Sequence, residues 1–332
     1  ICKIKTMKIK TSIIGIGHLG KIHCNLLINN KLADFIGVYD IVPSNSQKIV
    51  DKFNIKNFNS IDELIEQSEA VIIAAPTSAH YEIAEKCLLA SRHCFIEKPV
   101  TSTVEEAKKL ASVAEKNKEL VIQVGHIERF NPAIKALSKY PISPLFIEAH
   151  RLSQFKPRSI DVSVVHDLMI HDIDIVLWTV KSPIKSIDAN GVNVITDTID
   201  IANVRINFEN GAVANLTSSR ISAKPMRKMR FFQKFGYFSV DFAKPDIDVF
   251  RLTNNINPNA ISANMLGDIA ELDLGKHILF EKPEIIPSNA MEDEQTAFLN
   301  SIIKKEKSVM SLEAATKALE VAGIIVKQIA QK

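Results

Sequence analysis

The sequence predicts an α/β protein in two parts, a doubly wound parallel sheet followed by an α+β domain with a largely antiparallel, open sheet. Three observations predict this. Apolar runs alternate with helical segments through residues 8–125, and short strand-like runs separated by Asn-Gly, Gly or Pro turns follow residue 145. Three glycines at GxGxxG spacing also stand between the first apolar run and the first helical segment. At 332 residues the chain is long enough for two domains, which we expect at 7–125 and 126–332.

In the first part, strand signals alternate with helix signals. Continuous apolar runs, typical of buried parallel strands, cover 8–14, 34–39, 70–76, 93–99 and 120–125. Helical periodicity begins at 18 and at 44 and covers 60–67, 79–91 and 101–118, the last with Thr101 or Ser102 as its N-cap. This βαβ alternation places the carboxyl ends of the strands at one edge of the sheet, where folds of this kind bind ligands.

The rhythm changes in the second part. Strand-like runs cover 145–152, 184–195, 200–208, 212–219, 228–235, 236–242 and 246–253. One apolar helix over 163–180 interrupts them, and helices over 291–306 and 311–332, the latter capped by Ser311, close the chain. Because an exposed sheet face usually needs covering, we expect a homo-oligomer, a dimer or a tetramer.

The composition is that of an average soluble globular protein. Apolar residues make up 46 % of the chain, and 41 basic residues are interspersed with 38 acidic ones, so the chain lacks the basic face of a nucleic-acid-binding protein. No apolar run is long enough to span a membrane and the start lacks the apolar core of a signal peptide, so we expect a cytoplasmic protein. The four cysteines, Cys2, Cys24, Cys87 and Cys94, form no CxxC pair, and we expect reduced thiols. Residues 1–6, before Met7, fit no element and are interpreted as a disordered leader or an upstream extension.

The glycines of the segment SIIGIGHLGKIH predict a Rossmann-type dinucleotide site. Gly15 permits a tight turn, Gly17 lets the backbone approach a pyrophosphate, and Gly20 lets the helix pack closely on the sheet. The helix that begins at His18 and Leu19 directs its first N–H groups and the positive end of its dipole towards the phosphates. A glycine pattern without context is more often an ordinary turn, but the flanking strand and helix favour the dinucleotide site.

Asp40 favours NAD over NADP. It ends the second predicted strand twenty residues beyond Gly20, where an acidic side chain accepts hydrogen bonds from the adenosine ribose. A carboxylate at this point repels a 2′-phosphate, and the next residues, Ile41 and Val42, offer no cation. The alternative is that Asp40 only caps the strand end.

Two groups of residues are candidates for proton and oxyanion chemistry. Lys98 follows a strand at the ligand-binding edge, and Pro99 holds it extended, so its ammonium can stabilise an oxygen that gains charge; a solvated surface lysine is the alternative. In the helix over 163–180, Asp167, His171 and Asp174 occupy positions i, i+4 and i+7, with His171 a general base and Asp167 its support. A structural histidine is the alternative there. The HExxH spacing is absent, and we predict no metal site.

Candidate substrate contacts lie between these groups. Glu128, Arg129 and Asn131 follow the last parallel strand, where Arg129 can recognise an anionic or polyhydroxyl substrate, while Asn131 before Pro132 also reads as a helix N-cap. Three cations suited to a diphosphate, or to a solvated basic loop, follow in the segment HRLSQFKPRSID: Arg151, Lys156 and Arg158.

With these residues the chain resembles the glucose-fructose oxidoreductase, inositol dehydrogenase and MocA (Gfo/Idh/MocA) family of NAD(P)-dependent oxidoreductases, from about Lys8 to about Ile325. The motifs that carry the resemblance are GIGHLG, AAPTSAHY, Glu97-Lys98-Pro99 and the Asp167 to His171 spacing. It implies a Rossmann domain and an α/β domain whose open sheet commonly makes subunit contacts.

The resemblance also implies roles for single residues. Lys98 and His171 would lie beside the nicotinamide C4 and the reacting carbinol, with Asp167 in support. Further cofactor contacts would come from the matching motifs, at Ala75, Pro76, Thr77, His80 and Glu97. One departure is that Ser163, Val164 and Val165 stand where many members have glycines, so substrate contacts do not transfer simply.

Within the family the sequence looks most like the bacterial enzymes that oxidise the C3 hydroxyl of UDP-N-acetylglucosamine with NAD, an early step towards 2,3-diamino sugars for lipid A. The segments GIGHLGKIH, VGHIERFNPAI and VHDLMIHDIDIVLW carry this likeness. The alternatives are a dehydrogenase of a free polyol or sugar, such as myo-inositol, and an NAD-binding regulator without catalysis. The sequence leaves open whether Lys98 or His171 is the final base.

Overall fold

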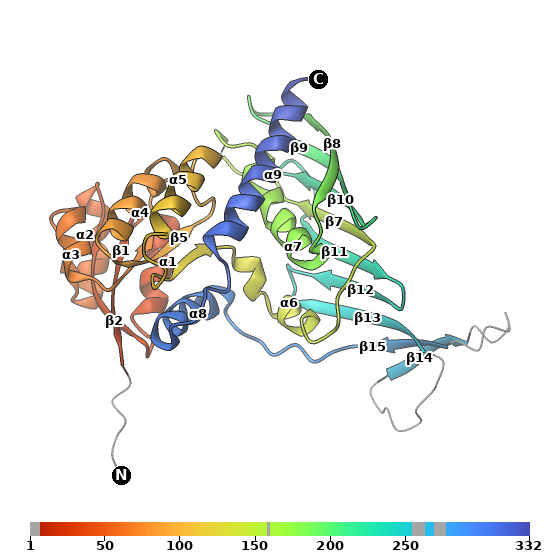
Figure 1. Cartoon of the computed structure of the whole chain (residues 1–332), viewed down its shortest axis with the longest axis horizontal. Helices are drawn as coiled ribbons and strands as arrows, with labels where there is room; N and C mark the ends of the chain where they lie inside the picture. The colour runs from red at the N-terminus through yellow and green to blue at the C-terminus, as the bar shows by residue number, and fades with distance from the viewer. Residues whose placement is uncertain (1–6, 158–159, 254–262, 269–276) are drawn as a thin grey trace, which may run out of the picture. The chain divides into compact units, whose positions relative to one another are not determined.

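The computed structural model describes residues 7–157, 160–253, 263–268 and 277–332 (Figure 1). They form two compact units. The first runs to Ile127 and includes Asn289–Glu320, and the second comprises Glu128–Ser288 and Val321–Lys332. Sequence reasoning placed everything after residue 125 in one domain, whereas Asn289–Glu320 pack into the cores of the first unit. Residues 1–6, which were interpreted as a disordered leader or an upstream extension, lie outside the described residues.

The first unit is built on a parallel sheet, as predicted. Among its described residues the strand order is β3-β2-β1-β4-β5-β6. The strands are β1 (Ile9–Ile14), β2 (Ala33–Tyr39), β3 (Lys56–Asn57), β4 (Ala70–Ile73), β5 (His93–Glu97) and β6 (Ile122–Gly125). All residues of β4 are buried, as its continuous apolar run requires of a strand covered on both faces. The order reverses at β1, and the crevice at such a reversal is where doubly wound sheets bind ligands.

Helices cover both faces of this sheet (Figure 1). One core packs β-sheet residues against α3 (Ile61–Gln67), α4 (His80–Leu89), α5 (Val104–Ala114) and the first part of α9 (Leu312–Ala330). The other packs them against α1 (His18–Leu27), α2 (Pro43–Phe53) and α8 (Ala290–Lys304). Ile13 and Ile14 of β1 point into opposite cores, as neighbours on a strand must.

Local capping explains where several of these helices begin. Ser311 caps α9 as predicted, since its Oγ accepts from Ala314 N at 3.2 Å. The prediction of Thr101 or Ser102 as the cap of α5 is wrong. Thr103 is the cap, because it forms a capping box with Glu106, three residues on.

The second unit is built on a mixed, mostly antiparallel sheet, which confirms the predicted class. In its described part the strand order is β14-β15-β13-β12-β11-β7-β10-β9-β8, and only the β7–β10 pair is parallel. The predicted strands are present as β7 (Phe146–Leu152), β8 (Ile184–Val192), β9 (Ile201–Phe208), β10 (Val213–Ser219), β11 (Met226–Gln233), β12 (Gly236–Asp241) and β13 (Asp246–Thr253). The sequence did not predict β14 (Ala263–Asp268) or β15 (His277–Glu281).

Helices α6 (Pro132–Leu137) and α7 (Ile170–Val180) lie on one side of this sheet (Figure 1). The predicted single α-helix over 163–180 is wrong at its start, because Val165–Met169 is a π-helical turn. Such turns are rare and occur often at functional sites. On the other face a row of half-buried aromatic rings crosses the sheet, with centroids 4.7 to 5.5 Å apart: Phe146, Phe232, Tyr237, Phe250 and Phe280.

Candidate active site

The glycine turn between β1 and α1 is shaped by two close approaches. Gly15 has φ +90°, a left-handed conformation, and a Cβ there would lie 2.5 Å from Ala75 N. A Cβ on Gly20 would lie 1.9 Å from Gly15 O, so only glycine lets α1 approach the turn this closely. Both positions therefore require glycine for the fold itself, whatever binds at the turn.

Gly17 differs, because its surroundings are open. A Cβ on Gly17 would meet no heavy atom within 4 Å, and Gly17, His18 and Leu19 are exposed. Gly17 is also the N-cap of α1, and its carbonyl oxygen accepts the first hydrogen bond of the helix, from Lys21 N at 3.1 Å. The N–H groups ahead of this bond have no acceptor within the helix. This exposed helix start, free of a side chain at position 17, fits a pyrophosphate.

Asp40 lies directly beyond β2 and fastens the end of that strand to the glycine turn. Its Oδ2 accepts from Ile16 N at 2.6 Å, and its Oδ1 accepts from Val42 N at 2.8 Å and Asn45 Nδ2 at 3.1 Å. Asp40 therefore makes the contacts of a strand cap. It leaves Asp40 at the ligand-binding edge, where a carboxylate opposes a 2′-phosphate.

The segment after β4 carries Ala75, Pro76 and Thr77, and it runs through a short 3-10 turn (Thr77–Ala79) into α4. His80 follows, and its ring is 1 % exposed. Its Nε2 lies 2.9 Å from Ala75 O and its Nδ1 lies 2.9 Å from Pro99 O. The ring thus joins two loops at the carboxyl ends of neighbouring strands, rather than projecting into solvent.

Glu97 and Lys98 end β5 at the same edge, with a cis peptide bond between Lys98 and Pro99. Lys98 is half-buried, whereas Glu97 is 6 % exposed and its side chain turns inward. Glu97 Oε1 lies 2.8 Å from His23 Nε2, and Oε2 accepts from Lys98 N at 3.2 Å. Burial by itself raises the pKa of Glu97, but the hydrogen bond from His23 and the nearby Lys98 bring that pKa below its usual value. Sequence reasoning missed His23, although its place three residues after Gly20 predicts that it shares the buried face of α1.

In the second unit, Arg129 is bound by Asp174. Arg129 Nε and Nη2 donate to the two carboxylate oxygens of Asp174 at 2.6 and 2.8 Å, and the guanidinium lies 4.8 Å from the Trp178 ring. Asp174 is 2 % exposed. The pair holds the turn before α6 against α7, and it engages the Arg129 side chain that sequence reasoning offered to the substrate.

Arg151 is engaged in the same way. Its Nη1 donates to Glu128 Oε1 at 2.7 Å, and its Nη2 donates to Asp172 Oδ1 at 2.7 Å. Arg151 as a whole residue is 2 % exposed. Although burial favours the neutral guanidine, the two carboxylates raise the pKa of Arg151 above its usual value. Burial raises the pKa of Asp172 despite the attraction of Arg151. This geometry does not support the diphosphate role predicted for Arg151.

Three further residues were predicted to contact the substrate, and they lie in different surroundings. Asn131 caps α6, because its Oδ1 accepts from Ala133 N at 3.1 Å, and its Nδ2 donates to Glu128 and to Phe242 O. Lys156 is exposed on the loop after β7. Arg158 lies outside the described residues.

His171 and Asp167 lie at the junction of the π turn and α7. Asp167 is within Val165–Met169 and is half-buried, and His171 is the second residue of α7 and 9 % exposed. The α-helical spacing that grouped Asp167, His171 and Asp174 therefore applies only from Ile170 onward. Asp167 and His171 remain about one turn apart, whereas Asp174 is ion-paired with Arg129.

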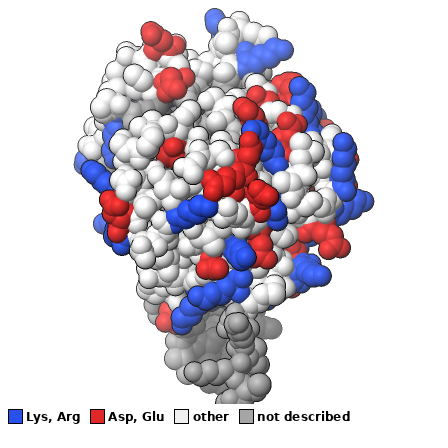
Figure 2. All heavy atoms as spheres, turned by 90° about the vertical axis from the view of Figure 1, so that its left-hand side faces the viewer, with Lys and Arg blue, Asp and Glu red and all other residues white. Residues whose placement is uncertain are grey.

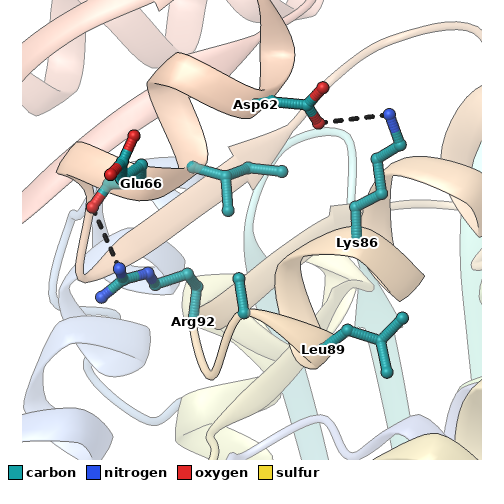
Figure 3. A pocket seen from close by; sticks show the side chains of 7 residues that line it. Asp62, Glu66, Lys86, Leu89 and Arg92 are labelled. Carbon is teal, nitrogen blue, oxygen red and sulfur yellow. Dashed lines mark hydrogen bonds and ion pairs between the residues drawn. The ribbon is translucent and has the colours of Figure 1, made fainter.

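A hollow of about 430 Å³ between α3 and α4 lies away from these residues (Figure 3). Two of its basic side chains have acceptors in the lining, since Lys86 Nζ lies 3.2 Å from Asp62 Oδ1 and Arg92 Nη2 lies 3.0 Å from the backbone oxygen of Glu66. It lies beside the carboxyl-terminal ends of these helices, opposite the edge that carries the glycine turn. We therefore assign it no part in the site.

Three observations concern surface charge, membrane spans and metal ligands. The face in Figure 2 carries basic side chains beside acidic ones. Within the described ranges, no helix has the length and apolarity needed to cross a membrane. The described residues also contain no group of three or more His, Cys, Asp or Glu placed to hold a metal ion.

Comparisons with known proteins agree with this geometry. A model of an oxidoreductase family with an NAD-binding Rossmann fold matches residues 9–126, and a model of the Gfo/Idh/MocA C-terminal domain matches residues 145–237. UDP-N-acetylglucosamine 3-dehydrogenase of Acidithiobacillus ferrooxidans is 38 % identical over 242 residues, which cover 73 % of this chain and 76 % of that protein. Inositol 2-dehydrogenase of Salmonella typhimurium is 28 % identical over 54 % of this chain and 57 % of its own length.

Solved structures extend the likeness along the whole chain. The structure of the Acidithiobacillus ferrooxidans dehydrogenase has a TM-score of 0.86 and 31 % identity, and it covers 98 % of this chain and 99 % of that one. The apo scyllo-inositol dehydrogenase of Lactobacillus casei, at 19 % identity and a TM-score of 0.78, covers 98 % of this chain and 97 % of its own, and shares the fold. This chain therefore belongs to the Gfo/Idh/MocA family of oxidoreductases with an NAD-binding Rossmann domain.

Proposed function

We propose that this protein oxidises the C3 hydroxyl of UDP-N-acetylglucosamine to a ketone with NAD, a step that leads to 2,3-diamino sugars for lipid A. The observation that carries the proposal is the 38 % identity to a UDP-N-acetylglucosamine 3-dehydrogenase over 73 % of the chain. The open, glycine-defined helix start at Gly17 supports the cofactor part of it. Asp40 supports NAD in preference to NADP.

In this proposal the protein supplies binding, orientation and proton transfer. NAD held at the glycine turn would supply the hydride acceptor for the oxidation of the sugar carbon. Lys98 stabilises the hydroxyl oxygen as it gains alkoxide character, and His171 accepts the proton, directly or through Lys98. Asp167 supports the charged imidazole. The proposal requires Lys98 and His171 to meet at the reacting carbon.

The test is a substrate panel followed by trapping. Purified protein is incubated with NAD and UDP-N-acetylglucosamine, UDP-glucose, N-acetylglucosamine or myo-inositol, NADH absorbance is followed, and any ketone is trapped with hydroxylamine before mass measurement. We expect turnover with UDP-N-acetylglucosamine and an oxime of its 3-keto product. In folded protein, Lys98→Met and His171→Asn each lower kcat by about 100-fold or more. Full turnover in either variant would remove that residue from the mechanism.

A second candidate, a dehydrogenase of a free polyol or sugar, is favoured by one observation. Arg151, the cation that best suited a diphosphate, is buried between Glu128 and Asp172. Faster turnover of myo-inositol than of any UDP-sugar would select this candidate. NAD binding without turnover of any substrate would instead select a regulator.

We also infer a homo-oligomer and a cytoplasmic location. The support for the oligomer is the aromatic row on the face of the second sheet opposite α6 and α7, from Phe146 to Phe280. A second copy of the chain is the partner we propose for this face, as a dimer or as half of a tetramer.

A further inference from the structure

We propose that two buried histidines, His23 acting through Glu97 and His80 acting on Pro99, are positioning residues for Lys98. The inference rests on the proposed function, because it assigns them to the lysine that we place beside the reacting oxygen. Both histidines lie in the first unit with Lys98, and neither side chain reaches solvent, with exposures of 0 % and 1 %.

On the amino side, a chain of hydrogen bonds runs from α8 to the Lys98 peptide. Gln295 Nε2 lies 2.7 Å from His23 Nδ1 and 3.2 Å from His23 O. His23 Nε2 lies 2.8 Å from Glu97 Oε1, and Glu97 Oε2 accepts from Lys98 N at 3.2 Å. The backbone of Lys98 is therefore tied through buried side chains to a helix that follows it by almost two hundred residues.

This arrangement fixes one tautomer of His23. An amide nitrogen only donates, so the nitrogen of Gln295 that faces both Nδ1 and the His23 carbonyl makes Nδ1 an acceptor. His23 then carries its proton on Nε2 and donates it to the Glu97 carboxylate. A buried carboxylate needs such donors, and here His23 and the Lys98 N–H supply them.

Gly125 leaves room for this carboxylate. A Cβ on Gly125, at the end of the neighbouring strand β6, would lie 2.9 Å from Glu97 Oε2. The glycine lets Glu97 lie flat against the strand with both oxygens in use. Without that space, Oε2 would be displaced from the Lys98 peptide.

On the carboxyl side, His80 holds the peptide that follows Lys98. Its two ring nitrogens each lie 2.9 Å from a backbone carbonyl, Pro99 O and Ala75 O. Carbonyls only accept, so a neutral ring can donate to one of them, whereas the imidazolium donates to both. The ring is therefore a donor for which the two loops compete.

His80 also couples two loops that the proposed reaction uses together. Ala75 belongs to the segment that we propose contacts NAD, and Pro99 adjoins Lys98. One ring holds both, so a shift of the Ala75 carbonyl changes the donor that Pro99 receives. The geometry thus links the cofactor loop to the lysine without a direct contact between them.

The first experiment reads the rings and needs no turnover. Nitrogen-15 NMR of the histidine rings in the full-length protein, near neutral pH, with resonances assigned by His23→Gln and His80→Gln, reports the protonation of each nitrogen. We expect His23 to be protonated on Nε2 and to accept on Nδ1. A His23 that carries its proton on Nδ1 would overturn the proposal.

The second experiment reads the position of Lys98. Lysines are reductively methylated with carbon-13 formaldehyde, and the Lys98 resonance is identified by its absence from Lys98→Met. We expect this resonance to move in His23→Gln and His80→Gln. His93→Gln is the matched control, because His93 is a half-buried histidine at the other end of β5 that accepts from Val121 N at 2.9 Å. An unchanged Lys98 resonance in the first two variants would refute the proposal even if the protein proves to have another substrate.

The kinetic counterpart applies once a substrate is established. His80→Gln is expected to lower kcat about tenfold while the KM for the sugar stays within about twofold, since misplacement of a catalytic group lowers rate more than binding. His93→Gln is expected to leave kcat within about twofold. If His80→Gln and His93→Gln lowered kcat equally, the role of His80 would be structural and not that of a positioning residue for Lys98.

Discussion

Arg151 and Asp172 form a buried ion pair in which three donor-acceptor contacts, of 2.7 to 3.1 Å, join one guanidinium to one carboxylate. Glu128 takes the remaining side of the guanidinium. The pair connects β7 to α7 within the second unit, so the helix that carries His171 is fastened to the sheet by charge as well as by apolar packing.

Removal of one partner should therefore cost stability. Asp172→Asn is expected to lower the free energy of unfolding by about 3 to 5 kcal/mol, because it leaves the buried guanidinium without its main partner. Urea unfolding measures the change. Arg230→Met, which removes a surface pair with Glu148, is the control and should cost less than about 1 kcal/mol. An Asp172 variant as stable as the control would show that the pair does not hold α7.

The glycine turn allows cofactor binding and folding to be separated. Gly17→Ala places a methyl group where the structure has open space, so stability should change by less than about 1 kcal/mol. The same methyl group would meet the pyrophosphate, and the Kd for NAD, measured by calorimetry, should rise about tenfold or more.

Gly323→Ala is the matched control for that variant. It also meets no heavy atom within 4 Å but lies in α9, so it should leave the Kd unchanged and stabilise the protein by about 0.5 to 1 kcal/mol. If Gly17→Ala binds NAD as tightly as the native protein, the pyrophosphate lies elsewhere.

Asp200 predicts a specific acid sensitivity. Burial favours its neutral form, but the backbone N–H groups of Val194, Ile195 and Thr196 donate to Oδ2 and hold the pKa at about 2. Because the folded pKa lies below the unfolded one, the stabilisation is present above about pH 4 and is lost as pH falls towards 2.

Asp200→Asn should thus lower the free energy of unfolding by about 2 kcal/mol near neutral pH, and the difference from the native protein should shrink as pH falls below about 4. Unfolding by urea at several pH values measures it. Asp197→Asn, at an exposed position of the same loop, should have no such pH-dependent effect. A constant difference across the acid range would contradict the assignment.

The described cysteines should be chemically silent. Burial raises the pKa of Cys24 to about 12, and Cys87 and Cys94 are buried too, with free thiols. In a Cys2→Ser variant we expect no fast reaction with a thiol reagent in the native state and three reactive thiols, the four cysteines less Cys2, after unfolding. A fast native reaction would show that one of these helices or strands opens readily.

The aromatic row should control assembly. Phe232→Asp puts a charge in its centre and is expected to shift the protein to the monomer in light scattering coupled to size exclusion, because a buried unpaired charge costs several kcal/mol. Phe235→Asp is the control, since Phe235 is 67 % exposed at the adjoining turn and outside the row. A Phe232 variant that assembles normally would place the subunit contact elsewhere.

The sequence predicts the fold well because the signals that specify it are local. Continuous apolar runs mark β1 and β4, alternation marks β9, and a glycine pattern marks the first turn. The roles of charged residues are harder to predict, because they depend on partners that are distant in the chain. Arg129 and Arg151 look available in sequence, but their partners lie on a helix that follows by 45 and 21 residues.

The same limit applies to protonation and helix type. The environment of His23 depends on Gln295, 272 residues away, which no local pattern reveals. The π turn at Val165–Met169 lies in a segment whose apolar spacing predicts an ordinary α-helix. The identities of Lys98 and His171 as candidates came from residue type and position, and their convergence on one carbon stays a prediction.

The return of Asn289–Glu320 to the first unit has a consequence for biosynthesis. Phe298 and Leu299 fill one of its cores, and Met310 and Leu319 fill the other, so the two cores stay incomplete until the ribosome has made residues 298–319. The intervening segment is therefore available to fold before the amino-terminal sheet is sealed. In ribosome-bound chains that stop before residue 289, protease should cleave the first unit readily. In chains that also include residues 289–320, the first unit should be protected from protease.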